Sequence, residues 1–259
     1  MSSKLKSSIS YSSLKTENVK GILSNKGGEV INSIIRSFEE IGYFVNEPRI
    51  LNAKHFNVPQ KRERIFLVAI RKDLSRFVNF KYPAKYPKIF TLRDALKKGD
   101  LFNKDVPKTE GQIYPQRKKE ILSKVPQGGY WRDLPDDLQR EYMRGSYFLG
   151  GGKTGLARRL SWDEPSLTLT CAPAQKQTER CHPNETRPLT FREYARIQTF
   201  PDEWQFCGSL SSIYKQIGNA VPVNLAYAVG RSLVNLLNEI ENYEIQNSNL
   251  KKDYKNKKK

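Results

Sequence analysis

The stretch Pro59-Gln60-Lys61-Arg62-Glu63-Arg64 runs directly into Ile65-Phe66-Leu67-Val68-Ala69-Ile70, so that a basic segment is followed by six consecutive apolar residues. A continuous apolar run of this length is typical of a strand that is buried inside a sheet. We therefore predict a buried strand at 65–70, preceded by a basic loop, in a protein of the α/β class.

The residues before this stretch add a helix and a further strand. Apolar residues recur at helical spacing over 29–42, and Gly42 supplies a stop at the C-terminal end. Residues 43–51 are strand-like but are interrupted by Pro48, which is typical of a strand at the edge of a sheet. The predicted order is helix, strand, basic loop, strand.

The residues after the strand behave differently. Proline and glycine punctuate residues 79–183 without strong periodicity, which predicts an irregular segment of loops and short strands. Thr190 and Glu193 form a capping-box pattern at the start of the next helix. Pro222 then opens a long helix with an apolar face.

Composition narrows the function classes. The chain has 259 residues, with 45 Lys and Arg against 27 Asp and Glu, a net charge of +18. No apolar run approaches the roughly 18 residues of a membrane span, and residues 1–16 do not resemble a secretory signal, so we predict a cytoplasmic protein without a membrane partner. Three cysteines without paired spacing and only two histidines argue against a disulfide framework and a zinc site. The cysteines are predicted to be packing thiols: Cys171, Cys181 and Cys207.

The positive charge is concentrated in two places. Residues 54–93 hold eleven Lys and Arg against two acidic residues, interleaved with phenylalanine and tyrosine. Basic residues alternating with aromatic ones suit a surface that follows nucleic-acid phosphates. The second concentration, Lys251–Lys259, is interpreted as part of a solvated, disordered tail.

Four segments stand out as motifs, in this order along the chain: Glu17-Asn18-Val19-Lys20-Gly21-Ile22-Leu23; Pro59-Gln60-Lys61-Arg62-Glu63-Arg64; Arg187-Pro188-Leu189-Thr190-Phe191-Arg192-Glu193-Tyr194-Ala195-Arg196 with Phe200-Pro201-Asp202; and Gln216-Ile217-Gly218-Asn219-Ala220-Val221-Pro222. Together they resemble the later motifs of the DNA cytosine-5 methyltransferases of bacterial type II restriction–modification systems. The resemblance covers residues 17 to about 235. It identifies the chain as the C-terminal part of such an enzyme, from motif VI to motif X, with its target-recognition domain.

The resemblance implies a chemistry. In this family a cysteine thiolate adds to C6 of a cytosine flipped out of duplex DNA, and C5 then takes a methyl group from S-adenosylmethionine. By resemblance Glu17 is the carboxyl group at N3 and at the exocyclic amine, and Arg64 is the cation at O2. Arg62 is expected to hold the active-site loop or a phosphate. From the residues alone, Glu17 could equally be a surface carboxylate, and both arginines could pair with Glu63.

The resemblance also implies binding residues. Asn219 and the backbone of Ala220 are expected to approach the methionine end of the cofactor, and a helix beginning after them would favour its carboxylate. The alternative is that Gly218-Asn219 forms only a turn. Arg187 and Arg192 are expected to brace the recognition domain and, with Gln60, to take part in DNA binding.

Two family elements have no counterpart in the sequence. There is no Phe-x-Gly-x-Gly loop and no Pro-Cys-Gln, which carries the nucleophile, and the residues before Glu17 are polar where the family has an apolar strand. We therefore expect that Glu17 lacks its positioning strand and that the chain alone does not methylate DNA. Two interpretations follow: a subunit of a split enzyme, whose partner polypeptide carries the N-terminal motifs, or a truncated remnant. A third is a sequence-specific DNA-binding module without catalysis.

The predicted organisation is a partial Rossmann-like S-adenosylmethionine-dependent methyltransferase domain with a small, irregular target-recognition domain inserted in it. The boundaries are 1–78 for the first catalytic part, 79–184 for the recognition domain, 185–245 for the returning catalytic segment and 246–259 for the tail. Residues 79–184 are expected to read base edges in the major groove of double-stranded DNA.

Overall fold

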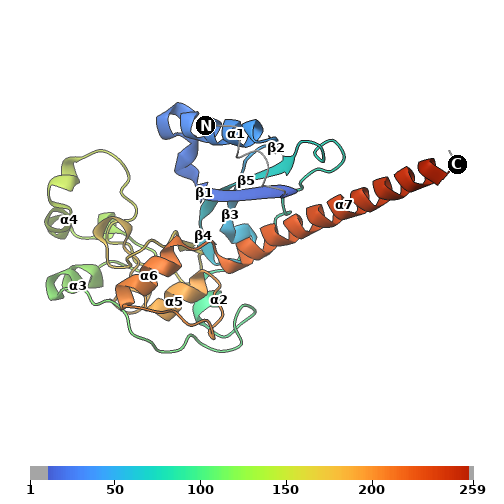
Figure 1. Cartoon of the computed structure of the whole chain (residues 1–259). Helices are drawn as coiled ribbons and strands as arrows, with labels where there is room; N and C mark the ends of the chain where they lie inside the picture. The colour runs from blue at the N-terminus through green and yellow to red at the C-terminus, as the bar shows by residue number, and fades with distance from the viewer. Residues whose placement is uncertain (1–10, 257–259) are drawn as a thin grey trace. The chain divides into compact units, whose positions relative to one another are not determined.

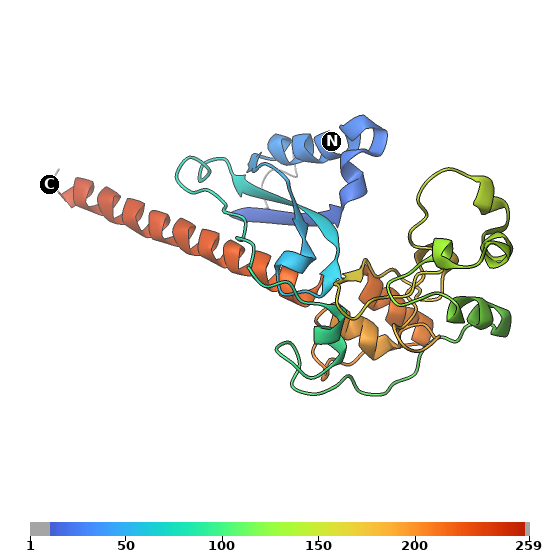
Figure 2. The same ribbon diagram turned by 180° about the vertical axis from the view of Figure 1, so that it is seen from behind.

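The computed structural model describes residues 11–256, which fall into two compact units (Figures 1 and 2). Unit 1 consists of the described parts of Met1–Asn52, Glu63–Lys85 and Tyr227–Lys259. Unit 2 consists of Ala53–Arg62 and Tyr86–Ala226. The expected boundary at residue 184 therefore does not divide the two units, because residues on both sides of it lie in unit 2.

Unit 1 contains a four-stranded sheet with β5 at its centre. Its strands are β1 Ser13–Val19, β2 Tyr43–Val45, β3 Arg49–Asn52 and β5 Glu63–Arg71. Strand β5 pairs antiparallel with β1 along one edge and with β2 and β3 along the other. The predicted buried strand at 65–70 is thus confirmed, and Pro48 lies in the gap between β2 and β3.

Helices cover the two faces of β5. Ile65 and Leu67 pack in a cluster with helix α1, Glu29–Glu40. Val68 and Ile70, which alternate with them along the strand, pack against helix α7, Val223–Asn256. All four side chains are almost completely buried, which contributes roughly 1.5–3 kcal/mol each to stability. The α/β class is confirmed, because the apolar run is buried between two helical layers.

Strand β1 corrects the expectation that Glu17 lacks a positioning strand. The polar segment pairs with β5 over its whole length, from Ser13 opposite Ile70 to Val19 opposite Arg64. An edge strand keeps one side open to solvent, so it needs backbone pairing rather than a continuous apolar sequence.

Unit 2 is built from short helices and long connections. Its helices are α2 Leu92–Leu96, α3 Gln116–Ser123, α4 Asp136–Met143, α5 Phe191–Ile197 and α6 Leu210–Asn219. Its strands β4, Gln60–Lys61, and β6, Ser166–Leu167, form one short parallel pair. Single 3-10 turns complete the described chain: η1 Lys20–Leu23 and η2 Asn25–Gly28 in unit 1, and η3 Ala53–His55, η4 Trp131–Asp133, η5 Arg144–Phe148 and η6 Lys176–Thr178 in unit 2. The irregular segment therefore contains mainly helical turns, where we expected short strands.

The helix ends follow the local sequence signals. The backbone N–H of Thr190 donates to Glu193 Oε2 at 2.7 Å and the Thr190 side chain accepts from Glu193 N, so the predicted capping box is confirmed. Gly42 adopts a φ of 93°, which only glycine adopts without strain, two residues after α1 ends.

Helix α7 begins directly after Pro222, as predicted, and continues to Asn256. The expectation of a disordered tail from residue 246 is not met over 246–256, because no glycine or proline interrupts the chain after Gly230. Among residues 11–256, no single helix is long and apolar enough to span a membrane, and only α6 with Val223–Asn249, taken together as a bent pair, passes by length and composition.

Candidate functional site

The first and second motifs meet on the sheet of unit 1. Glu17 on β1 lies opposite Phe66 of β5, and Arg64 lies opposite Val19, so the two side chains are diagonal neighbours on one face. Arg64 Nε lies 2.9 Å from Glu17 Oε1, and both side chains are mostly buried. The structure thus brings together two predicted site residues that are 47 positions apart in the chain.

This ion pair is incompletely satisfied. Glu17 Oε1 is shielded from solvent and has no partner in hydrogen-bond geometry, since the Arg64 contact is a charge contact only. Arg64 Nη1 donates to the carbonyl oxygen of Glu63 at 2.9 Å. Burial lowers the pKa of Arg64, and the charge of Glu17 partly offsets this. A buried acceptor beside a desolvated cation is an arrangement that can still bind a polar ligand.

Arg62 has a different environment, although it is only two residues from Arg64. Its side chain is completely buried in unit 2, where it donates to the carbonyl oxygens of Leu169 at 2.9 Å, Gly218 at 2.7 Å and Ala220 at 3.0 Å. Arg62 fixes the backbone of the fourth motif and of Leu169, and does not pair with Glu63.

Gln60 is also buried, which corrects its predicted part in DNA binding. Its Nε2 donates to Gln198 Oε1 at 3.1 Å, while its Oε1 accepts from the backbone N–H of Leu169 at 3.0 Å. Gln198 Nε2 in turn donates to the carbonyl oxygen of Ile217 at 2.8 Å. Through Gln198, the enclosed Gln60 side chain connects the second motif to the segment of the third motif and to the fourth motif.

The fourth motif requires glycine for packing. A Cβ atom on Gly218 would lie 2.5 Å from the carbonyl oxygen of Thr170, so only glycine allows α6 to approach this segment. The next residue, Asn219, is exposed, and its Oδ1 accepts from Cys171 Sγ at 3.2 Å. Gly218-Asn219 is therefore a point of close packing at the end of α6 and not only a turn.

Asn219 and Ala220 line neither of two cavities in unit 2, one of about 850 Å³ and one of about 640 Å³. At the start of α7, the N–H of Val223 donates to Gln198 O and that of Asn224 to Thr199 Oγ1, so these donors are not available to a cofactor carboxylate. Among residues 11–256 no cluster of His, Cys, Asp or Glu could hold a metal ion.

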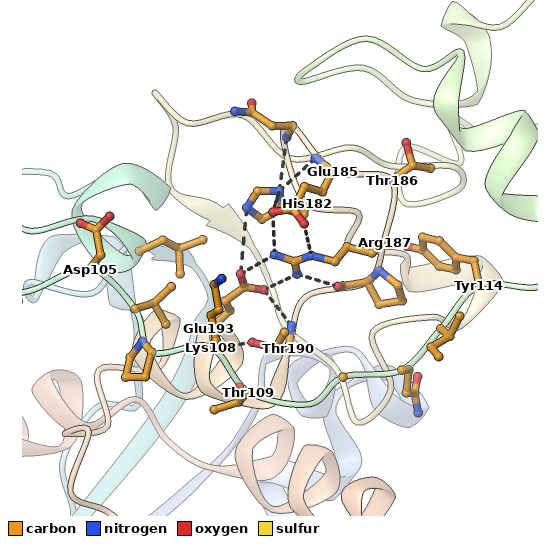
Figure 3. Close-up of a pocket in the computed structure, with 18 of the residues that line it drawn as sticks. Asp105, Lys108, Thr109, Tyr114, His182, Glu185, Thr186, Arg187, Thr190 and Glu193 are labelled. Atoms are coloured by element: carbon orange, nitrogen blue, oxygen red, sulfur yellow. Dashed lines mark hydrogen bonds and ion pairs between the residues drawn. The ribbon is translucent and has the colours of Figure 1, made fainter.

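The third motif lines a cavity of about 850 Å³ in unit 2 (Figure 3). Figure 3 shows the Arg187 guanidinium between two carboxylates: it donates to Glu193 at 2.8 and 2.9 Å and to Glu185 at 2.9 and 3.1 Å. Its hydrogen bonds to these carboxylates, above all to Glu193, raise the pKa of Arg187. Above them, His182 Nδ1 accepts from the N–H groups of Asn184 and Glu185, and burial lowers the pKa of His182. Two carboxylates compensate the charge of Arg187, which holds Glu185 and Glu193 together within unit 2.

Arg192 fixes the loop after α5. It donates to the carbonyl oxygens of Pro201 and Trp204 at 3.4 and 3.2 Å and lies over the rings of Phe191 and Phe206. These contacts all lie within residues 191–206, so they hold α5 to the loop after it and do not reach residues 79–184. The second cavity, of about 640 Å³, lies beside the same loop and is lined by Pro201–Glu203 and residues 99–104.

The cysteines differ in environment. Cys181 is buried, and burial raises its pKa to about 11, as expected of a packing thiol. Cys171 and Cys207 are exposed, so the prediction that all three are packing thiols is wrong for these two.

Arg159, which is absent from the predicted site residues, is central to the irregular segment. This buried guanidinium donates to six acceptors, among them the carbonyl oxygens of Leu122, Val125 and His182. No sequence signal identifies it, because all its partners lie more than twenty residues away and most are backbone atoms.

Comparisons with known proteins agree on one family. The family model described as C-5 cytosine-specific DNA methylase matches residues 12–235. The type II methyltransferase M.Eco47II of Escherichia coli is 64% identical over 227 residues, covering 88% of this chain and 54% of that protein. M.Sau96I of Staphylococcus aureus is 48% identical, covering 92% and 54%. A solved DNA modification methyltransferase encoded within an E. coli prophage has the same fold, with a TM-score of 0.57 and 22% identity over 88% of this chain.

These matches correct the identification of the chain as the C-terminal part of an enzyme, motifs VI to X. The family model spans residues 12–235 as a whole, and the alignments to type II methyltransferases extend over 88% or more of this chain. The chain spans about half the length of the curated relatives it matches. Nothing in the comparisons supports a partner polypeptide or an inactive remnant.

Proposed function

Because the chain belongs to the C-5 cytosine-specific DNA methylase family, we propose that it acts on duplex DNA in the methylation of cytosine at C5, and that Glu17 and Arg64 bind the flipped target base. The observation that carries the proposal is the 2.9 Å contact between Arg64 Nε and Glu17 Oε1, which sets a carboxyl and a guanidinium side by side.

The pair matches the polar edge of cytosine. A carboxylate accepts a hydrogen bond from the exocyclic amine, and its protonated form donates to N3, while a guanidinium donates to O2. Both interactions withdraw electrons from the ring and make C6 more open to attack by a nucleophile. Glu17 Oε1 has only a charge contact with Arg64 and no partner in hydrogen-bond geometry, so binding the base would give this buried acceptor a hydrogen bond.

The family's methyl donor is S-adenosylmethionine, which supplies the methyl group when it is bound. We propose Asn219 and the backbone of Ala220 as the residues near its methionine end. The N–H groups of Val223 and Asn224 at the start of α7 are already bonded within the chain.

DNA binding would use the positive charge of the chain. We place phosphate contacts on the basic block 54–93 and base readout on residues 79–184, since phosphate contacts position a protein and base contacts specify the sequence. Arg187, Arg192 and Gln60 are left with structural roles, because their polar groups are already bonded within unit 2.

A selection experiment tests this function. The chain is incubated with a library of random duplexes, and the bound fraction is sequenced. We expect an enriched motif that contains cytosine. The target cytosine of that motif is then located by placing 2-aminopurine, whose fluorescence rises on unstacking, at its neighbours.

Variants then test the base-binding pair. Glu17→Ala should abolish the rise in 2-aminopurine fluorescence with less than about a threefold change in DNA affinity, because flipping and phosphate binding use different groups. The matched control is Glu63→Ala, which removes a partly exposed carboxylate paired with Lys20 in the η1 turn. If the selection enriches no motif that contains cytosine, the proposed function is contradicted. If the fluorescence rise is unchanged in Glu17→Ala, the proposed role of the pair is contradicted.

Methyl transfer is measured on the same enriched duplex. Labelled methyl groups from S-adenosylmethionine should appear in 5-methylcytosine after digestion of the DNA to nucleosides. Label in any other nucleoside would contradict the proposed reaction.

A further inference from the structure

The cavity that the third motif lines is bounded on one side by the connection between α2 and α3, residues 97–115 (Figure 3). Hydrogen bonds fix this connection within unit 2. The N–H of Val106 donates to the carbonyl oxygen of Leu96 at 2.9 Å, and that of Phe191 donates to the carbonyl oxygen of Glu110 at 3.3 Å. The cavity of about 850 Å³ is therefore preformed by the fold, and its volume lies in the range of small-molecule sites, roughly 300–1,000 Å³.

His182 and Glu193 line this cavity as a hydrogen-bond donor and an acceptor that do not reach each other. The N–H groups of Asn184 and Glu185 donate to His182 Nδ1, so the proton of the neutral ring is on Nε2. Burial lowers the pKa of His182 below its ordinary value of 6.5, which keeps the ring neutral at pH 7. Nε2 lies 4.0 Å from Glu193 Oε1, too far for a hydrogen bond, and both side chains are more than nine-tenths buried. A hydroxyl group between them would accept from Nε2 and donate to Oε1, so the pair suits a hydroxylated ligand.

The charges that line the cavity favour an anionic ligand. Four cationic side chains stand against three carboxylates, a net charge of +1 while His182 is neutral. All three carboxylates are already paired, with Arg187 or with Lys97. The remaining cations are Lys108 and Lys119, and neither forms an ion pair with a carboxylate among residues 11–256. A phosphate group would accept hydrogen bonds from both ammonium groups.

Part of the wall is apolar, and this part distinguishes an organic ligand from a simple anion. Leu96, Val106, Ile113, Trp162 and Pro188 line it. Ile113 is 86% exposed, so it contributes an apolar surface to the cavity without being packed in the core. Inorganic phosphate would pair with the lysines but would leave both this wall and the gap between the donor and the acceptor unfilled.

We propose that this cavity binds a small phosphorylated sugar, with a hydroxyl group between His182 and Glu193 and the phosphate on Lys108 and Lys119. The site lies within unit 2 and uses neither of the residues assigned to the target base, so it goes beyond the proposed function and does not depend on it. A DNA strand carries phosphates but no free hydroxyl on its internal sugars, so it matches only half of this arrangement.

Isothermal titration calorimetry at pH 7 tests the site with three probes: ribose 5-phosphate, ribose and inorganic phosphate. We expect saturable binding of one ribose 5-phosphate per chain. Ribose and inorganic phosphate should each bind at least about tenfold more weakly, because each lacks one of the two sets of polar contacts.

Variants assign the two ends of the probe. Lys108→Gln/Lys119→Gln should weaken ribose 5-phosphate binding by about tenfold or more, because the phosphate loses its charge-assisted hydrogen bonds. In His182→Asn, the amide oxygen would still accept from the backbone N–H groups, but the donor at Nε2 is lost. This variant should weaken ribose 5-phosphate binding and leave inorganic phosphate binding unchanged. The matched control is Lys215→Gln, which removes an exposed lysine of α6 outside the cavity and should have no effect.

Three results would overturn this site. Inorganic phosphate might be held as tightly as ribose 5-phosphate, which would reduce the cavity to a simple anion site. The double lysine variant might bind the probe as well as the unmodified chain does, or a short DNA duplex might displace the probe; either result would place the probe outside the cavity. Binding of ribose 5-phosphate by a chain that binds no DNA would support the site and contradict only the proposed function.

Discussion

Arg62 shows how strongly one residue can depend on partners far along the chain. Two of its carbonyl acceptors are buried and the third is partly buried, so Arg62→Ala should lower the free energy of unfolding by about 3–5 kcal/mol, the range for removing one partner of a buried charged network. Urea unfolding measures this. Arg192→Ala, which removes a partly exposed arginine with two carbonyl partners, should cost less than about 1.5 kcal/mol. Equal losses in the two variants would mean that the Arg62 contacts contribute little.

Arg64 combines a functional and a structural role. Arg64→Ala should abolish base flipping, and it should also lower the free energy of unfolding by about 1–3 kcal/mol, because the mostly buried Glu17 carboxylate loses its compensating charge. The double variant Glu17→Ala/Arg64→Ala should recover part of the loss in urea unfolding. A double variant with the full sum of the two single losses would show that the side chains do not interact.

Helix α6 can approach residues 170–171 only because it ends in Gly218. Gly218→Ala should lower the free energy of unfolding by about 1–3 kcal/mol, since the new Cβ would lie 2.5 Å from the Thr170 carbonyl oxygen and the backbone must shift. Gly230→Ala in α7 is the matched control, because no atom lies within 4 Å of its Cβ position. That variant should raise stability by about 0.5–1 kcal/mol through helix propensity. A neutral Gly218→Ala would contradict the close packing.

Helix α5 is tied to the loop after it by Arg196, which is fully buried and donates to Asp202 at 2.6 and 2.8 Å. These hydrogen bonds lower the pKa of Asp202 below its ordinary value of 3.8. The unfolded state therefore takes up a proton before the folded state does, so the stabilisation is present above pH 3.8 and is lost as the pH falls through the folded pKa.

Unfolding free energies measured between pH 6 and pH 2 test this. Asp202→Asn should lower stability at pH 6 and flatten its decline below pH 4. Asp163→Asn, at an exposed pair with Arg93, should leave the pH profile unchanged. A profile for Asp202→Asn parallel to that of the unmodified chain would exclude Asp202 as a cause of acid sensitivity.

At the level of the whole molecule, the net charge of +18 makes salt-dependent DNA binding the expected behaviour. Removing Lys251–Lys259 deletes six lysines and one aspartate, so it should weaken nonspecific binding and lower the slope of log affinity against log salt. The sequence preference found by selection should stay the same, because phosphate contacts carry no sequence information. A changed preference would mean that this segment reads bases.

Local signals in the sequence were enough for several elements. The apolar run at 65–70, the helical periodicity that gives α1, the Thr190 capping box and the start of α7 after Pro222 were all predicted, because each depends on neighbours within a few residues. The four motifs and their order were sufficient for the family. The strand β1 and the length of α7 were not predicted. A polar sequence can form an edge strand once a neighbouring strand pairs with it, as β5 does with β1. A polar sequence can also continue a helix where no glycine or proline interrupts it, as at the end of α7.

The roles of individual polar residues depended on contacts that the sequence does not contain. Arg62 and Arg64 are two positions apart and have the same chemistry, yet one is buried against a carbonyl 156 residues away and the other pairs with Glu17 on the sheet. Gln60 is polar and is enclosed, while Phe148 is apolar and is exposed. Residue type and local pattern determine which elements form and which family the chain belongs to. Burial and hydrogen-bond partners are set by tertiary contacts between distant segments, and these decide which polar groups remain available for a ligand.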